Sequence, residues 1–159
     1  MSNMKKVALL LSVVVIAYWS AWGKTYYLTK RYFDYAVAQE AEGHPVVALK
    51  GMNKLELRIE ERYFGGYQQV LEAWDSTTFG LRPSFYYQSQ QAPQRLLSRL
   101  NAAELYAFID VYVQLDVRYV PEVAHLLMLK SSEQGNEALE AEMRDFLINA
   151  FPDHPLAQF

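Results

Sequence analysis

The chain has 159 residues, of which 52% are hydrophobic and 21% are charged, with 15 Lys and Arg against 18 Asp and Glu. These proportions are typical of a folded globular protein, and the formal net charge of −3 excludes the basic footprint by which nucleic-acid-binding domains attract phosphate. The lack of cysteine excludes disulfides, thiolate metal ligands and cysteine nucleophiles.

The chain begins with an apolar segment. Two lysines precede the run Val7 to Ala17, and no charged residue follows before the end of the segment at Gly23. The hydrocarbon core of a bilayer needs about 17 to 20 such residues, so residues 1–23 are predicted to form a membrane anchor. The same segment resembles a cleavable signal peptide, with small residues near Gly23 at the position of the cleavage site.

Aromatic residues cluster where this run ends, and they favour retention of the anchor because amphipathic rings prefer the headgroup layer of a bilayer. The predicted membrane-interface residues are Tyr18, Trp19, Trp22, Tyr26 and Tyr27. The short basic N-terminus favours a single pass through a bacterial inner membrane, with an α-helical domain of residues 24–159 in the periplasm. Basic residues also follow the segment, so the opposite orientation stays open.

Helical periodicity continues beyond the anchor. Pro45 to Arg62 carries apolar residues at helical spacing, although Leu55 to Glu60 alternates apolar and charged residues as a strand does. Length favours the helix. A second apolar face at Tyr67 to Trp74 follows the pair Gly65 and Gly66, which lets the chain reverse, so the two segments are predicted to form a helical hairpin.

The segment Asp75 to Pro93 contains glycine, prolines and small polar residues without an evident apolar stripe, and it is predicted to be a long loop. Its aromatic and arginine side chains are of the kinds enriched at protein interfaces. Inward packing onto the helices, stacking on glycan rings and contact with lipid headgroups are the alternatives. The predicted partner-binding residues are Phe79, Arg82, Phe85, Tyr86 and Tyr87.

Further helices are predicted in the last third of the chain. A short one covers Gln94 to Leu100, and Asn101 to Glu104 has the residue types of a capping box that begins the next. Another begins at Pro121 and ends near Lys130, and the last covers Glu137 to Phe151. The predicted core residues of the last helix are Met143, Phe146 and Leu147.

The succession of short paired helices resembles tetratricopeptide repeats. Gly43 and Ala48 match the spacing between the turn glycine of that motif and the small residue of its second helix. The resemblance covers Tyr32 to Leu57, and Phe151 to Pro155 is similar to the proline-terminated end of such a repeat. It implies an all-α fold of antiparallel helical hairpins that binds a protein or peptide.

Catalytic and metal-binding patterns are weak. None of the three histidines His44, His125 and His154 lies at helical spacing from another, so no zinc site is predicted. Glu60 and Glu61 offer neighbouring carboxylates, but they fit a solvated helix face better than an acid/base pair. No catalytic residue, metal or cofactor is predicted.

The sequence therefore favours a non-catalytic, membrane-anchored adaptor or accessory subunit that binds a protein partner at the membrane surface. One alternative is a soluble periplasmic protein, released by cleavage after Gly23, that binds envelope glycan or peptide. A second alternative is a hydrolase that uses Glu60 or Glu61.

Overall fold

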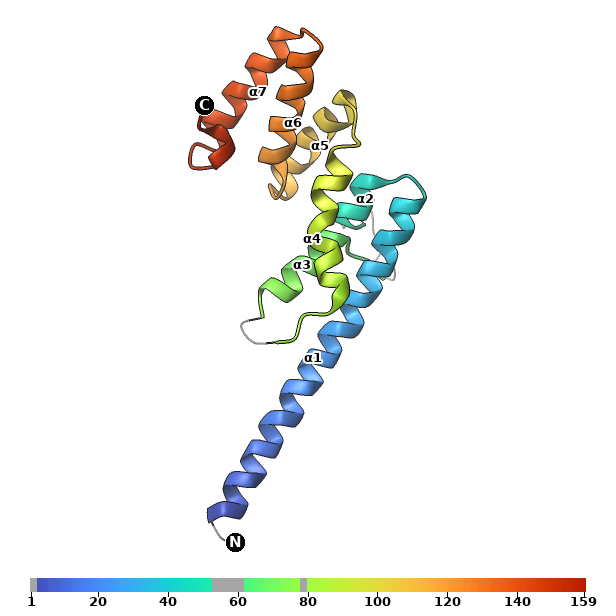
Figure 1. Ribbon diagram of the computed structural model, residues 1–159, viewed down its shortest axis with the longest axis vertical. Coiled ribbons are helices and arrows are strands. Elements are labelled where there is room, and N and C mark those ends of the chain that lie inside the picture. Colours follow the sequence, from blue (N-terminus) through green and yellow to red (C-terminus); the bar gives the residue numbers. More distant parts are fainter. Residues whose placement is uncertain (1–2, 53–61, 78–79) are drawn as a thin grey trace. The chain divides into compact units, whose positions relative to one another are not determined.

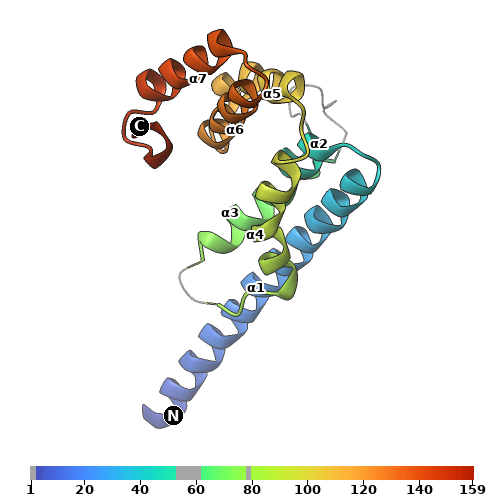
Figure 2. The same ribbon diagram turned by 45° about the horizontal axis from the view of Figure 1, so that its top comes forward.

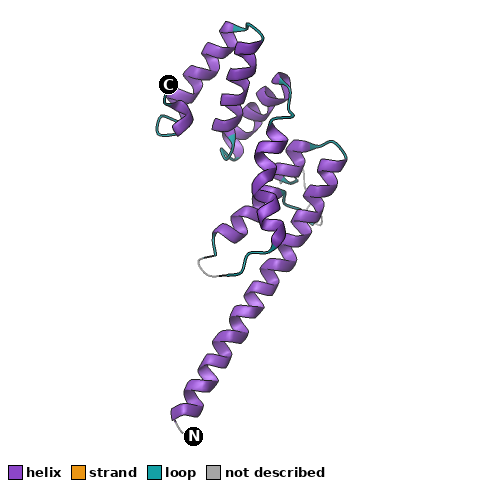
Figure 3. Cartoon of the chain, in the orientation of Figure 1, coloured by secondary structure: helices purple, strands orange, loops and turns teal. Residues whose placement is uncertain are grey.

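The computed structural model describes residues 3–52, 62–77 and 80–159. Within these ranges every regular element is helical, as the sequence predicts (Figure 3). The chain divides into two compact units, Met1–Ala92 and Pro93–Phe159, which are described separately. The boundary expected at residue 23 lies inside the first helix.

Helix α1 (Asn3–Ala41) is one continuous helix of 39 residues, about 58 Å long at 1.5 Å per residue (Figure 1). Its N-terminal half exposes a run of large apolar side chains, among them Leu10 and Ile16, each 66% exposed. Its C-terminal half is part of the first unit, where Thr29 and Ala36 are completely buried. The apolar segment therefore continues into the folded part as a single helix.

Helices α2 (Pro45–Lys50) and α3 (Tyr67–Asp75) pack against the C-terminal half of α1 (Figure 2). The helix predicted over Pro45 to Arg62 is interrupted after Lys50, because Gly51 adopts a φ of +80° that ends α2, and residues 53–61 of the predicted range lie outside the described residues. The choice between helix and strand at Leu55 to Glu60 lies outside the described residues.

The end of α2 crosses the start of α3 at backbone contact distance. A Cβ atom on Gly66 would lie 2.4 Å from the carbonyl oxygen of Ala48 and 2.6 Å from the backbone nitrogen of Gly51. The Gly66 backbone nitrogen donates a hydrogen bond to the Gln69 side chain at 2.7 Å, which caps α3. The predicted reversal at the glycine pair therefore places two backbones in direct contact.

Helix α4 (Ser84–Leu97) corrects the prediction of a loop over Asp75 to Pro93. The helix has a buried face, but small residues form much of it: Ser89 and Ala92 are completely buried beside larger neighbours such as Phe85. Ser89 also donates its hydroxyl to the Phe85 carbonyl at 2.8 Å. A hydrophobic pattern that counts only large side chains misses such a face.

The second unit contains α5 (Ala102–Leu115), α6 (Val120–Glu133), α7 (Glu137–Ala150) and the short 3-10 helix η1 (Pro155–Ala157). Helix α6 packs against α5 on one side and against α7 on the other. The predicted capping box is confirmed: Glu104 donates its backbone N–H to the Asn101 side chain at 3.0 Å, and the Asn101 N–H donates to the Glu104 carboxylate at 2.8 Å.

Candidate functional site

The first unit contains a cluster of aromatic side chains from α1, α3 and α4, here called the aromatic cluster. Its members are Trp22, Tyr26, Phe33, Trp74, Phe85 and Tyr86. Ring centroids of neighbouring members lie 5.2 to 5.9 Å apart, within the range of stacked and edge-to-face pairs. The cluster is the core that joins α1 to the rest of the unit.

Trp22 enters this cluster from the end of the apolar segment. Its ring stacks on Tyr26 with centroids 5.2 Å apart and meets Trp74 edge to face at 5.9 Å. Its indole N–H donates to the carbonyl oxygen of Leu81 at 2.9 Å. Trp74, which is only 1% exposed, donates its own N–H to the hydroxyl of Thr29 at 3.0 Å.

The other predicted interface residues remain open to their surroundings. The side chains of Tyr18, Trp19 and Tyr27 are 39%, 52% and 68% exposed, and Tyr26 is 37% exposed although one face of it stacks on Trp22. Contact of these residues with lipid stays a prediction.

The predicted partner-binding residues divide into three groups. Phe85 and Tyr86 lie on the buried face of α4, 4% and 2% exposed, as the alternative of inward packing requires. Tyr87 is 54% exposed, and the exposed Arg82 places its guanidinium carbon 4.8 Å from the centroid of the Tyr86 ring. Phe79 lies outside the described residues.

Tyr86 is held by a polar contact as well as by packing. Its phenol donates to the Asp75 carboxylate at 2.6 Å, and Gln90 donates to the phenol oxygen at 3.1 Å. The hydrogen bond to Asp75 favours the protonated phenol and, together with burial, raises the pKa of Tyr86 above its ordinary value. Tyr86 is therefore a structural residue that ties α4 to the end of α3.

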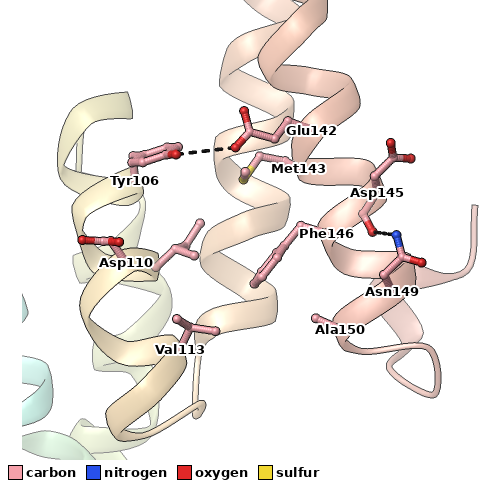
Figure 4. Close-up of a pocket in the computed structure, with 10 residues that line it drawn as sticks. Tyr106, Asp110, Val113, Glu142, Met143, Asp145, Phe146, Asn149 and Ala150 are labelled. Carbon is pink, nitrogen blue, oxygen red and sulfur yellow. Dashed lines mark hydrogen bonds between the residues drawn. The ribbon is translucent and has the colours of Figure 1, made fainter.

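The second unit contains a groove of about 410 Å³ between α5 and α7, here called the α5–α7 groove. Figure 4 shows Tyr106 and Glu142 facing one another and Phe146 pointing toward α5, whereas Asp110, Asp145 and Asn149 point outward from the two helices. The lining residues are Tyr106, Ile109, Asp110, Val113, Glu142, Met143, Asp145, Phe146, Asn149 and Ala150. The groove has the size of a site for a few side chains of a ligand or partner.

Apolar and acidic side chains are both present along this groove. Val113, Met143 and Phe146 supply apolar surface, whereas Asp110, exposed on α5, and Asp145, exposed on α7, supply carboxylates. No lysine or arginine is among the lining residues. The groove therefore offers an apolar floor with negative charge at its edges.

The core prediction for α7 needs one correction at this groove. Met143 and Leu147 are buried, 3% and 0% exposed, as predicted. Phe146 is only half-buried and lines the groove, with its ring edge to face against Phe151 at 5.7 Å. The helical period identified the face of α7 correctly, but it does not specify which part of that face α6 covers.

The search for a metal site gives a negative result for the described residues. Among them, no group of three His, Cys, Asp or Glu side chains converges in a way that could hold a metal ion. Glu60 and Glu61, the carboxylates considered for a hydrolase, lie outside the described residues.

Comparison of the chain with protein-family models, with curated proteins and with solved structures gave no match. A proposal on function must therefore come from the chain's own residues.

Proposed function

We propose that this protein is a non-catalytic, membrane-anchored adaptor. Helix α1 holds it in the bilayer, and the α5–α7 groove binds an amphipathic helical segment of a protein partner. The short basic N-terminus places the folded part in the periplasm of a bacterial cell in this proposal. Confinement to the membrane raises the effective concentration of the adaptor toward a partner in the same membrane.

The position of Trp22 carries the proposal. Cleavage after Gly23 would remove the indole that stacks on Tyr26, meets Trp74 and donates to Leu81. It would thereby open the core of the first unit. This favours an uncleaved anchor over the soluble protein released by cleavage.

The exposed surface of α1 supports a membrane segment over a core helix of a soluble domain. Helix α1 is long and apolar enough to cross a membrane, and none of its most apolar 18-residue window is buried against the described residues. Val7 to Gly23 would span about 26 Å as a helix, close to the roughly 30 Å of a bilayer core. A core helix of a soluble domain would bury its apolar face instead.

The chemistry of the α5–α7 groove specifies the partner segment. Its apolar floor, with Met143 and Phe146 from α7, suits the apolar side chains of an amphipathic helix laid into it. The carboxylates of Asp110, Glu142 and Asp145 at its edges favour lysine or arginine on the flanks of that helix.

The anchor is tested by the state of the protein in native membranes. We expect the chain to stay in the membrane pellet after alkaline extraction, since α1 is integral to the bilayer, and its intact mass to include residues 1–23. A released species that begins at Lys24 would contradict the anchor and favour the soluble alternative.

The groove is tested by cross-linking in intact cells. The variant Phe146→p-benzoylphenylalanine places a photoreactive group on the groove, whereas the same change at Ile148, 44% exposed on α7 and absent from the groove lining, is the control. We expect one defined cross-linked product from position 146 and none from position 148. Equal products from both positions would contradict a specific groove.

The negative charge at the groove is tested by the substitution Asp145→Lys in the full-length protein. Its exposed carboxylate forms no salt bridge with the residues that the structure describes, and the hydrogen bond from Asn149 goes to its backbone carbonyl at 2.8 Å, so the fold is expected to persist. Partner affinity should fall about fivefold at low salt, since one exposed charge pair contributes up to roughly 1 kcal/mol. Asp153→Lys, the same charge change at an exposed position outside the groove lining, should leave the affinity unchanged.

A further inference from the structure

The segment Gly80 to Arg82, which precedes α4, lies against α1 at the end of the apolar run. A Cβ atom on Gly80 would be 3.4 Å from the hydroxyl of Tyr18 and 3.8 Å from the Trp22 ring. The Trp22 indole N–H donates to the Leu81 carbonyl at 2.9 Å. The backbone of this segment is therefore fixed at the level of two residues predicted to lie in the membrane interface.

The side chain of Leu81 contributes little to the packing of the first unit. It is 72% exposed, more than any of the large apolar side chains in the apolar run from Val7 to Ile16. Its backbone carbonyl, rather than its side chain, makes the contact with Trp22. A large apolar side chain is thus presented beside the interface residues of α1 and is left mostly uncovered by the residues that the structure describes.

A basic side chain follows this leucine directly in the sequence. Arg82 is exposed, and its guanidinium stacks over Tyr86 at 4.8 Å from the ring centroid. An apolar side chain with a cation next to it is the arrangement that favours the boundary between acyl chains and anionic headgroups.

We propose that Leu81 inserts into the leaflet at the end of the α1 span and forms a second membrane contact of the first unit. This inference rests on the proposed function, because it requires α1 to cross the bilayer. A single spanning helix leaves its tilt free, whereas a contact beside the helix fixes the tilt and thereby which face of the first unit meets the lipid. Arg82 binds a phosphate group beside the inserted leucine.

The natural chain has no cysteine, so single cysteines give unique labelling sites in the full-length protein. The test places nitrobenzoxadiazole on Leu81→Cys, with Val14→Cys as the position within the bilayer. The control is Val37→Cys, which is 43% exposed on α1 and about 22 Å beyond Trp22 along the helix. Each protein is reconstituted alone into phosphatidylethanolamine and phosphatidylglycerol vesicles containing a lipid with a spin label high on its acyl chain.

We expect the Leu81 label to be blue-shifted and strongly quenched by the spin-labelled lipid, and the Val37 label to be neither. Quenching at Val14 with a Leu81 signal that matches Val37 would overturn the inference while leaving the anchor intact. That result would assign Leu81 to water or to a protein partner. Loss of quenching at Val14 as well would overturn the membrane anchor itself, so the two failures are distinguishable.

Discussion

Replacing Trp74 by alanine is expected to lower the free energy of unfolding by about 3–5 kcal/mol. The side chain is 1% exposed and joins α3 to α1 through its edge-to-face contact with Trp22. Its removal leaves a cavity among rings that other core side chains cannot fill. The lost hydrogen bond to Thr29 adds little, because that hydroxyl still donates to the Thr25 carbonyl at 2.7 Å.

The measurement is a urea titration of the detergent-solubilised full-length protein, followed by the near-ultraviolet circular dichroism of the packed rings. Tyr87→Ala is the matched control, because Tyr87 is an aromatic residue of the same unit but 54% exposed. Its effect should stay within about 0.5 kcal/mol. Equal effects of the two substitutions would mean that the aromatic cluster is not the core of the first unit.

The substitution Gly66→Ala is expected to destabilise the first unit by about 3 kcal/mol, the upper end of the usual cost of overpacking. The added methyl would overlap backbone atoms at 2.4 to 2.6 Å, from Ala48, Leu49 and Gly51, and backbone cannot rotate away as a flexible side chain does. The φ of Gly66 is −97°, which alanine adopts freely, so the effect is steric rather than conformational.

Gly23→Ala is the control for this prediction, since a methyl at Gly23 meets nothing within 4 Å and alanine favours a helix interior. It should leave the unfolding midpoint unchanged or raise it. A Gly66→Ala protein that unfolds like the wild type in the same titration would show that α2 and α3 can separate without loss of the core.

The sequence predicted those helices whose start signals are local. Asn101 and Glu104 form the capping box that their spacing indicates, and Pro121 lies in the first turn of α6. The continuous α1 agrees with the absence of glycine and proline between Lys24 and Glu42. In each of these cases the decisive interaction lies within a few residues of the chain.

The predictions that the structure corrects concern segments whose conformation or burial depends on tertiary contacts. Helix α4 is stabilised by burial of Ser89 and Ala92, whose small side chains carry little hydrophobic signal. Helix α2 stops because Gly51 must turn beside Gly66, a contact between residues 15 positions apart. The partial exposure of Phe146 depends on the spacing of α5 and α7 on either side of α6, which the sequence of α7 does not encode alone.

Under the proposed anchor, α1 serves both the bilayer and the aromatic cluster, and this couples membrane thickness to the stability of the first unit. The apolar run is short, and Trp22 at its end must stay at the boundary of the hydrocarbon to reach Trp74 and Leu81. In a thicker bilayer α1 would gain by sliding inward, but a shift of one turn, about 5.4 Å, would draw Trp22 out of its contacts. The first unit would then limit how deeply α1 enters the bilayer. It would be most stable in a membrane whose hydrocarbon thickness matches the length of the apolar run that begins at Val7.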